Sequence, residues 1–251
     1  MSGIQGIWVG SLLFLWFMSP VRAETVQVAV SSNFQGAFDA LKTDFERETS
    51  HQVLATSGAT GKFYAQIKAG APFDILLAAD QSTPEKLEAE GAAVTGSRFT
   101  YATGRLVLWS KDPKKVDIEG RVLQSDGFAH LAIASPKVAP YGAAAIEVLR
   151  RIGLYDRLRP RLVEGESIAQ AQQFVASGNA ELGFLALSQV CRDGQLTSGS
   201  AWFVPDQLHG PIHQQAVLLR HGETNQAAKA LLAFLKAPQR LPLLTSFGYV
   251  R

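Results

Sequence analysis

Four short segments are rich in small, hydroxyl-bearing and glycine residues, the types that can hold an anion through neutral groups. They are residues 31–33, 57–61, 140–142 and 165–168. Each stands where a helix is predicted to begin, so its backbone N–H groups lack partners within that helix. Such groups, with the positive end of the helix dipole, bind anions without a full positive charge. Taken singly, each segment is also typical of an ordinary helix cap.

The segment 56–61 carries the strongest signal, because it holds two glycines and three hydroxyl residues in six positions, more than one cap needs. It is not a phosphate loop of the GxxxxGK[ST] type, since the spacing is absent and Phe63 stands where a magnesium-binding Ser or Thr is required. The chain also has no GxGxxG motif. The segment therefore favours anion binding over nucleotide binding.

Catalytic and metal-binding alternatives find little support. Ser167 lies in a Gly-x-Ser-x-Ala pattern that resembles a nucleophile elbow without its last glycine, and we interpret it as a helix cap. His209 and His213 are separated by Gly-Pro and so do not share a helix face as metal ligands would. Asp74 and Asp80 flank a predicted strand as turn and cap residues. We predict no catalytic residue, no directly bound metal and no cofactor.

The elements that would position these segments alternate between strands and helices. Period-two and apolar runs predict strands, and spacings of three and four predict amphipathic helices, as at Phe34, Phe38, Leu41 and Phe45. This alternation indicates a parallel α/β fold. The predicted strands are 26–30, 53–55, 75–79, 106–109, 131–134, 182–187 and 215–220. Besides the helix that contains Phe34 to Phe45, helices are predicted at 62–69, 142–152, 168–176 and 224–235, and a further one begins near Pro84.

Composition excludes several classes of protein. Hydrophobic residues make up 47% and charged residues 18% of the 251 residues, which is too apolar for a disordered chain. The net charge of +2 gives no basis for a nucleic-acid interface. A single cysteine, Cys191, excludes an intrachain disulfide and is most simply a buried thiol.

The N-terminus predicts a leader. Residues 7–18 form an apolar run that is too short to span a bilayer, and Val21 and Ala23 stand at the −3 and −1 positions of a cleavage site. No Lys or Arg precedes the run, and the alternative is a buried N-terminal helix. We expect residues 1–23 to be a signal peptide cleaved after Ala23, and the mature protein to be periplasmic.

Several stretches together resemble the periplasmic molybdate-binding proteins of ABC importers. The most specific is the run Gln-Ile-Lys-Ala-Gly-Ala-Pro-Phe-Asp-Ile at 66–75, followed by Ala-Ala-Asp at 78–80. The similarity covers essentially the whole mature chain, and its other stretches are 29–34, 58–62, 135–142, 182–183 and 247–249.

The resemblance implies an α/β, type II periplasmic binding protein with two lobes, two crossover strands and a central cleft. Lobe 1 would comprise residues 24–103 and 210–251, and lobe 2 residues 104–209. The oxyanion would be held by Ser32, Asn33, Thr60, Tyr141 and the backbone N–H of Ile168, with Ser57 as a further candidate. Some relatives have a tyrosine where this chain has Ala186, and Tyr141 looks like its replacement.

The implied function is capture of molybdate, and of tungstate, for an ABC import permease, by a monomer that is not an enzyme and binds no nucleic acid. Neutral donors suit a doubly charged tetrahedral anion, whereas a protonated phosphate also needs an acceptor. Three alternatives stay open. One is a binding protein for another oxyanion such as sulfate, another is a secreted hydrolase that uses Ser167, and the third is a sensor domain that hands its ligand to a receptor.

Overall fold

The computed structural model describes residues 23–250, and we report no structure outside them. The predicted leader, except for its last residue, lies outside this range. Within it, no helix is both long enough and apolar enough to cross a membrane.

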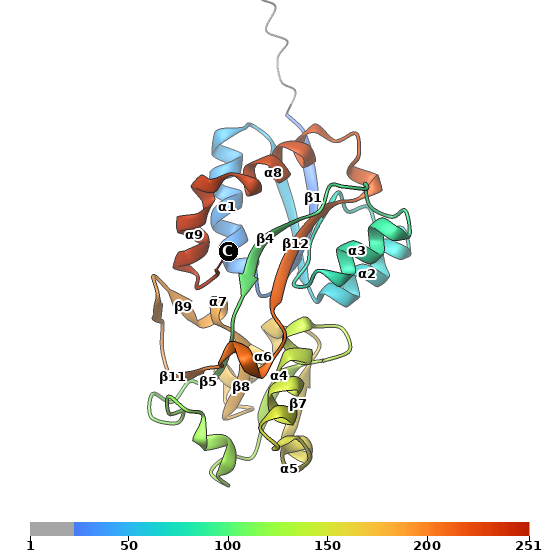
Figure 1. Cartoon of the computed structure of the whole chain (residues 1–251). Helices are drawn as coiled ribbons and strands as arrows, with labels where there is room; N and C mark the ends of the chain where they lie inside the picture. The colour runs from blue at the N-terminus through green and yellow to red at the C-terminus, as the bar shows by residue number, and fades with distance from the viewer. Residues whose placement is uncertain (1–22, 251) are drawn as a thin grey trace, which may run out of the picture.

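Two five-stranded sheets organise the chain into two lobes (Figure 1). The sheet of lobe 1 has the order β2-β1-β3-β12-β4, and that of lobe 2 the order β11-β5-β8-β6-β7. The strands of lobe 1 are β1 Thr25–Ser31, β2 Gln52–Gly58, β3 Ile75–Leu77, β4 Phe99–Gly104 and β12 Ile212–Leu218. Those of lobe 2 are β5 Leu106–Ser110, β6 Leu131–Ala134, β7 Leu162–Gly165, β8 Leu182–Ala186 and β11 Ser200–Phe203. A separate small ribbon pairs β9 Cys191–Arg192 with β10 Gln195–Leu196.

The lobes are joined where the chain runs from β4 into β5 and from β11 back into β12. β4 and β12 lie side by side as antiparallel neighbours and descend together toward lobe 2 in Figure 1. The prediction of parallel sheets is therefore wrong for these strands. β12 is antiparallel to both of its neighbours, and β5 is antiparallel to β8 and β11, while β1, β2 and β3 pair in parallel. The lobe boundaries near 103 and 210 stay predictions.

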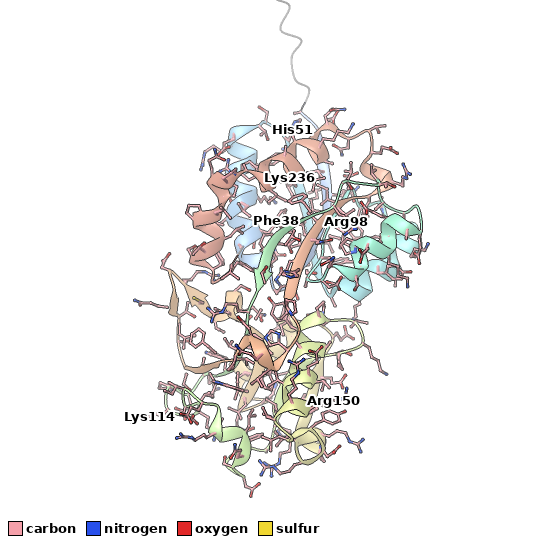
Figure 2. All side chains as sticks on the ribbon, viewed as in Figure 1. Phe38, His51, Arg98, Lys114, Arg150 and Lys236 are labelled. Atoms are coloured by element: carbon pink, nitrogen blue, oxygen red, sulfur yellow. The ribbon has the colours of Figure 1, made fainter. Side chains whose placement is uncertain are left out.

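Helices cover both faces of each sheet. Lobe 1 carries α1 Gln35–Glu48, α2 Thr60–Lys68, α3 Ser82–Ala89, α8 Gln226–Lys236 and α9 Leu241–Ser246. Lobe 2 carries α4 Pro140–Arg151, α5 Tyr155–Leu158, α6 Ile168–Ser177 and α7 Leu187–Val190. Short 3-10 turns are η1 Arg121–Gln124, η2 Arg159–Arg161, η3 Asp206–Leu208, η4 Arg220–Gly222 and η5 Pro238–Arg240. Figure 2 shows Phe38 and Arg98 among the side chains of lobe 1, and Lys114 and Arg150 in lobe 2.

Alternation along the central strands explains why lobe 1 has two apolar layers. Val26, Val28 and Val30 of β1 face the helices α1 and α8, whereas Ala29 faces α2 and α3. The predicted apolar face of α1 is confirmed, since Phe34, Phe38, Leu41 and Phe45 are fully buried. Each buried side chain of this size contributes about 1.5–3 kcal/mol. This packing holds the start of α1 at the carboxyl end of β1, beside lobe 2.

Candidate anion-binding site

A small cavity lies between the two lobes. One lobe provides the ends of β1 and β2 and the start of α2, and the other provides the starts of α4 and α6. The lining residues are Ser31, Ser32, Asn33, Gly58, Ala59, Thr60, Ala79, Ala139, Pro140, Tyr141 and Ile168.

The structure brings together five of the six predicted site residues. Ser32, Asn33, Thr60, Tyr141 and Ile168 all line the cavity, and each is buried. Their role in binding stays a prediction.

The sixth, Ser57, lies apart from them. It is exposed on β2, the edge strand of its sheet, and does not line the cavity. Strand β2 continues to Gly58, so alternation along it turns neighbouring side chains to opposite faces.

Backbone N–H groups supply one set of donors. Within the described residues, those of Asn33, Thr60, Tyr141 and Ile168 donate to no other protein group. Each lies at or just before the first turn of a helix, where such groups point out along the helix axis. The cavity therefore meets the positive ends of four helix dipoles, α1, α2, α4 and α6.

Hydroxyl groups supply the second set. Thr60 Oγ1 accepts a hydrogen bond from the backbone N–H of Ala79 at 3.0 Å and lies 2.5 Å from Ser31 Oγ. When Ser31 donates to Thr60, the Thr60 proton is free for the cavity. The Ser32 hydroxyl makes no hydrogen bond to another described residue, so it also remains available.

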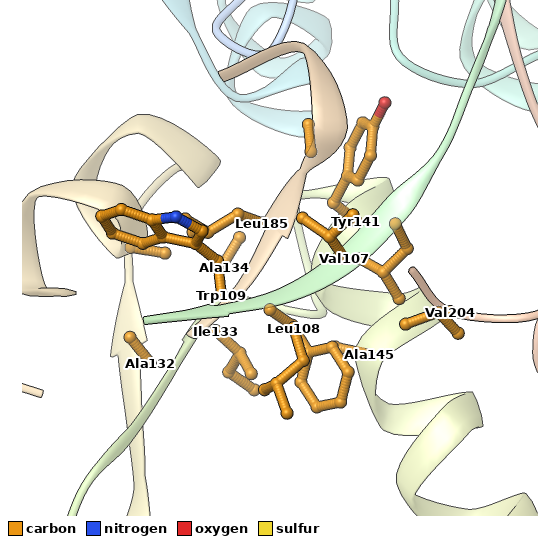
Figure 3. Close-up of a cluster of buried hydrophobic side chains, with 14 of the residues drawn as sticks. Val107, Leu108, Trp109, Ala132, Ile133, Ala134, Tyr141, Ala145, Leu185 and Val204 are labelled. Atoms are coloured by element: carbon orange, nitrogen blue, oxygen red, sulfur yellow. The ribbon is translucent and has the colours of Figure 1, made fainter. Parts of the chain in front are cut away.

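Tyr141 provides a hydroxyl from lobe 2. Its ring packs in the apolar core of that lobe, and Figure 3 shows the hydroxyl directed away from the labelled core side chains. Burial raises the pKa of Tyr141 well above its usual value, with a further contribution from nearby Tyr249. The hydroxyl therefore keeps its proton at physiological pH and can donate it.

Gln214 of β12 holds this hydroxyl in place, and sequence reasoning missed it. Gln214 Nε2 donates to Tyr141 Oη at 3.0 Å, and Gln214 is fully buried. The predicted strand begins at Gln215, whereas β12 begins at Ile212. A signal was present, because two adjacent glutamines precede an apolar run and at least one of them must face the interior.

The side chain of Asn33 is used inside the protein. Asn33 Nδ2 donates to Gln214 Oε1 at 2.9 Å and to Tyr249 Oη at 3.1 Å. Ser188 of lobe 2 donates to the backbone oxygen of Asn33 at 2.8 Å. Asn33 therefore joins the lobes through its carbonyl, while its side-chain N–H groups bond within lobe 1 and its backbone N–H is left for the cavity.

No lining residue among those described has a charged side chain. A charged pair bridges the lobes nearby, where Lys62 Nζ lies 2.6 Å from Glu166 Oε2. The Lys62 ammonium lowers the pKa of Glu166, whose side chain is exposed. Exposed pairs of this kind stabilise weakly.

The remaining sequence interpretations concern residues outside the cavity. Ser167 is confirmed as the cap of α6, because its hydroxyl accepts from the N–H of Gln170 at 3.3 Å. Asp80 is confirmed as a cap, since it accepts from the N–H of Thr83 at 2.7 Å, and burial raises its pKa. Cys191 is a buried free thiol. Ala186 is buried and does not line the cavity.

The two histidines that sequence analysis rejected as metal ligands have other neighbours. His213 Nδ1 lies 3.2 Å from Thr103 Oγ1, and His209 Nδ1 lies 2.6 Å from the carbonyl oxygen of Gly210. Across residues 23–250, no group of three or more His, Cys, Asp or Glu residues could hold a metal ion. The arrangement as a whole can hold a small anion by hydrogen bonds from neutral groups.

Known proteins are similar over nearly the whole chain. The family model for bacterial extracellular solute-binding proteins matches residues 26–250. Molybdate-binding protein ModA of Azotobacter vinelandii is 55% identical over 228 residues, which are 91% of this chain and 90% of that protein. ModA of Rhodobacter capsulatus is 50% identical over 232 residues, 92% of this chain and 90% of that protein.

A solved structure agrees. The Azotobacter vinelandii periplasmic molybdate-binding protein superposes with a TM-score of 0.86 and 42% identity, covering 90% of this chain and 99% of that one. The similarity confirms the α/β, two-lobed architecture of type II periplasmic binding proteins that was expected from the sequence. On this combined similarity, the chain belongs to the ModA family of bacterial extracellular solute-binding proteins.

Proposed function

We propose that this solute-binding protein captures molybdate as its dianion and delivers it to the permease of an ABC importer. The observation that carries the proposal is the cavity between the lobes, whose described lining offers N–H and O–H donors and no charged side chain. The relatives that are at least 50% identical bear the name of molybdate-binding proteins, which supports the same ligand.

Donors from both lobes suit a tetrahedral dianion. The hydroxyls of Ser32, Thr60 and Tyr141 and the N–H groups described above would surround its oxygens. A hydrogen bond to a charged acceptor is worth about 1.5–3 kcal/mol, so several of them can offset the loss of hydration. A hydrogen phosphate would bring a proton that finds no carboxylate in the described lining, which disfavours it.

Tungstate has the same shape and charge, so we propose it as a second ligand. Sulfate is smaller, and only the fit of the cavity can exclude it. We also propose that the protein acts as a periplasmic monomer after cleavage at Ala23, binds no nucleic acid and catalyses no reaction.

Calorimetric titration of the mature protein, residues 24–251, with sodium molybdate tests the proposal. We expect sub-micromolar affinity for molybdate and tungstate, and sulfate or phosphate binding weaker by at least about a hundredfold, because such a preference needs only about 2.7 kcal/mol. Tighter binding of sulfate than of molybdate would favour the alternative of a sulfate-binding protein. Turnover of generic esters that is abolished by Ser167→Ala would favour the hydrolase.

A competition titration distinguishes displacement of bound molybdate from non-specific effects of added salt. Each oxyanion is added as its sodium salt to protein already loaded with molybdate, at constant ionic strength. A ligand that binds only the folded state also raises the melting temperature, which gives an independent measure with the same samples.

A further inference from the structure

Gln214 is the centre of a buried hydrogen-bond network that joins the lobes. Its side chain is fully buried and lies next to an irregular point in the β4–β12 ladder, where the pairing skips Tyr101. Tyr101 Oη lies 3.0 Å from Gln214 Oε1, and Asn33 Nδ2 donates to the same oxygen at 2.9 Å. Lobe 1 thus contributes Asn33, Tyr101 and Gln214, and lobe 2 contributes Tyr141.

The network has a fixed direction. Because Asn33 and Tyr101 donate to the Gln214 oxygen, the amide nitrogen of Gln214 must face Tyr141. The nitrogen donates to Tyr141 Oη, so it cannot accept the Tyr141 proton. A hydroxyl that already accepts from an amide has its own proton free for another acceptor. That acceptor would be an oxygen of the anion in the cavity, which Tyr141 lines.

We propose that Gln214 is a positioning residue that makes Tyr141 a pure hydrogen-bond donor toward the bound oxyanion. The inference rests on the proposed function and adds to it a residue that does not line the cavity itself. The surroundings leave little room for another arrangement. A methyl group on Gly104 would lie 1.9 Å from Tyr141 Oη and 2.5 Å from Gln214 Nε2, so only glycine permits this approach.

Replacement by methionine removes the amide donor to Tyr141 together with the amide oxygen that accepts from Asn33 and Tyr101. In Gln214→Met, Asn33 Nδ2 keeps its bond to Tyr249 Oη at 3.1 Å, and Tyr101 Oη keeps its bond to the carbonyl of Ala78 at 3.1 Å. The Tyr141 oxygen alone loses its amide donor. Methionine is close to glutamine in length and shape, so the packing is largely retained.

The experiment is a double-mutant cycle on the mature protein, read by calorimetry with sodium molybdate. The variants are Gln214→Met, Tyr141→Phe and the double variant. We expect Gln214→Met to weaken binding about tenfold when Tyr141 is present, and by less than about threefold in the Tyr141→Phe background, because the lost bond no longer has a hydroxyl to orient. Tyr141→Phe alone should weaken binding by more than about tenfold.

Gln215→Met is the matched control. Gln215 is the next residue in β12 and is also buried, but its amide contacts Thr100 and Arg98 rather than Tyr141. It should change affinity by less than about threefold in both backgrounds. Denaturant unfolding of every unliganded variant shows whether it is folded, and Gln214→Leu replaces Gln214→Met if the methionine variant is not.

The outcomes separate the two proposals. Failure of the unmodified protein to bind molybdate overturns the proposed function, and the inference with it. Equal losses for Gln214→Met in both backgrounds, or no loss in the presence of Tyr141, overturn the inference alone. A large effect of Gln215→Met would also overturn it, since a general disturbance of β12 would then explain the result.

Discussion

Thr60 shows how one side chain of the cavity is fixed before any ligand is bound. Its oxygen accepts from the N–H of Ala79 and lies beside the hydroxyl of Ser31. It is buried and stands in the first turn of α2. These contacts hold the oxygen of Thr60 in place, and when Ser31 is the donor between the two hydroxyls, little rotational freedom is lost as Thr60 donates to an anion.

We expect Thr60→Ala to weaken molybdate binding by more than about tenfold, because it removes a donor to a charged acceptor. Thr60→Ser keeps the hydroxyl and should stay within about threefold of the unmodified protein. Calorimetric titration of both variants measures the difference. Equal affinities of Thr60→Ala and the unmodified protein would remove Thr60 from the site.

At this scale, the cavity residues at helix starts could be predicted from the sequence, whereas the residues that hydrogen-bond to them and fix their positions could not. Ser32, Thr60 and Tyr141 stand in short segments whose composition is unusual, so they could be found locally. Gln214 and Tyr249 are far from those segments in the sequence and reach Asn33 and Tyr141 only through the folded topology. A polar residue inside a strand shows no local pattern that reveals its partner.

At the scale of elements, the start of α2 contacts the loop before α4 across the gap between the lobes. The N–H of Gly61 donates to the carbonyl of Val138 at 2.9 Å across the gap between lobes. A methyl group on Gly61 would lie 2.9 Å from Val138 Cα, closer than such atoms can come. The glycine thus lets α2 reach the loop before α4 and close the cavity.

We therefore expect Gly61→Ala to weaken molybdate binding by about tenfold or more, while the unliganded protein unfolds at a similar denaturant concentration, because alanine suits a helix better than glycine. Gly210→Ala is the control, since the nearest atom to its added carbon is 3.8 Å away. Calorimetry and denaturant unfolding measure the two effects. Unchanged affinity of Gly61→Ala would mean that this approach is not needed for binding.

Most elements with a clear local pattern were predicted, and the irregular ones were not. Strand β6 matches its predicted bounds, and the helix predicted at 168–176 matches α6 to within one residue. β4, β7 and β11 were missed, because the first two mix apolar residues with Thr, Gly or Glu and the third begins in a segment rich in Ser, Thr and Gly. β4 forms part of the connection between lobes, so its omission also hid the antiparallel pairing.

At the scale of the whole molecule, three buried tyrosines bind protons more tightly in the folded state. Burial raises the pKa of Tyr101, Tyr141 and Tyr249 above their usual values. The unfolded chain loses these protons near pH 10, while the folded protein retains them. The unfolded state then binds fewer protons, so the free energy of unfolding falls as the pH rises above about 10.

We expect the denaturant midpoint to be lower at about pH 10.5 than at pH 8, and Tyr101→Phe to reduce this difference, because it removes one of the responsible hydroxyls. Tyr155→Phe is the control, since Tyr155 is only partly buried. Denaturant unfolding at both pH values gives the comparison. The same pH difference in Tyr101→Phe as in the unmodified protein would show that this tyrosine does not contribute.

The division of the cavity between two lobes determines how a captured anion must be unloaded. Ser32 and Thr60 stand on one lobe, and Tyr141 and Ile168 on the other. If a docked partner separates the lobes, we expect the anion to keep only the hydrogen-bond donors of one lobe, while solvent hydrates its other oxygens. We expect release to follow from separation of the lobes at the connecting strands and to need no change in the ionisation of the protein, because the described lining has no charged side chain.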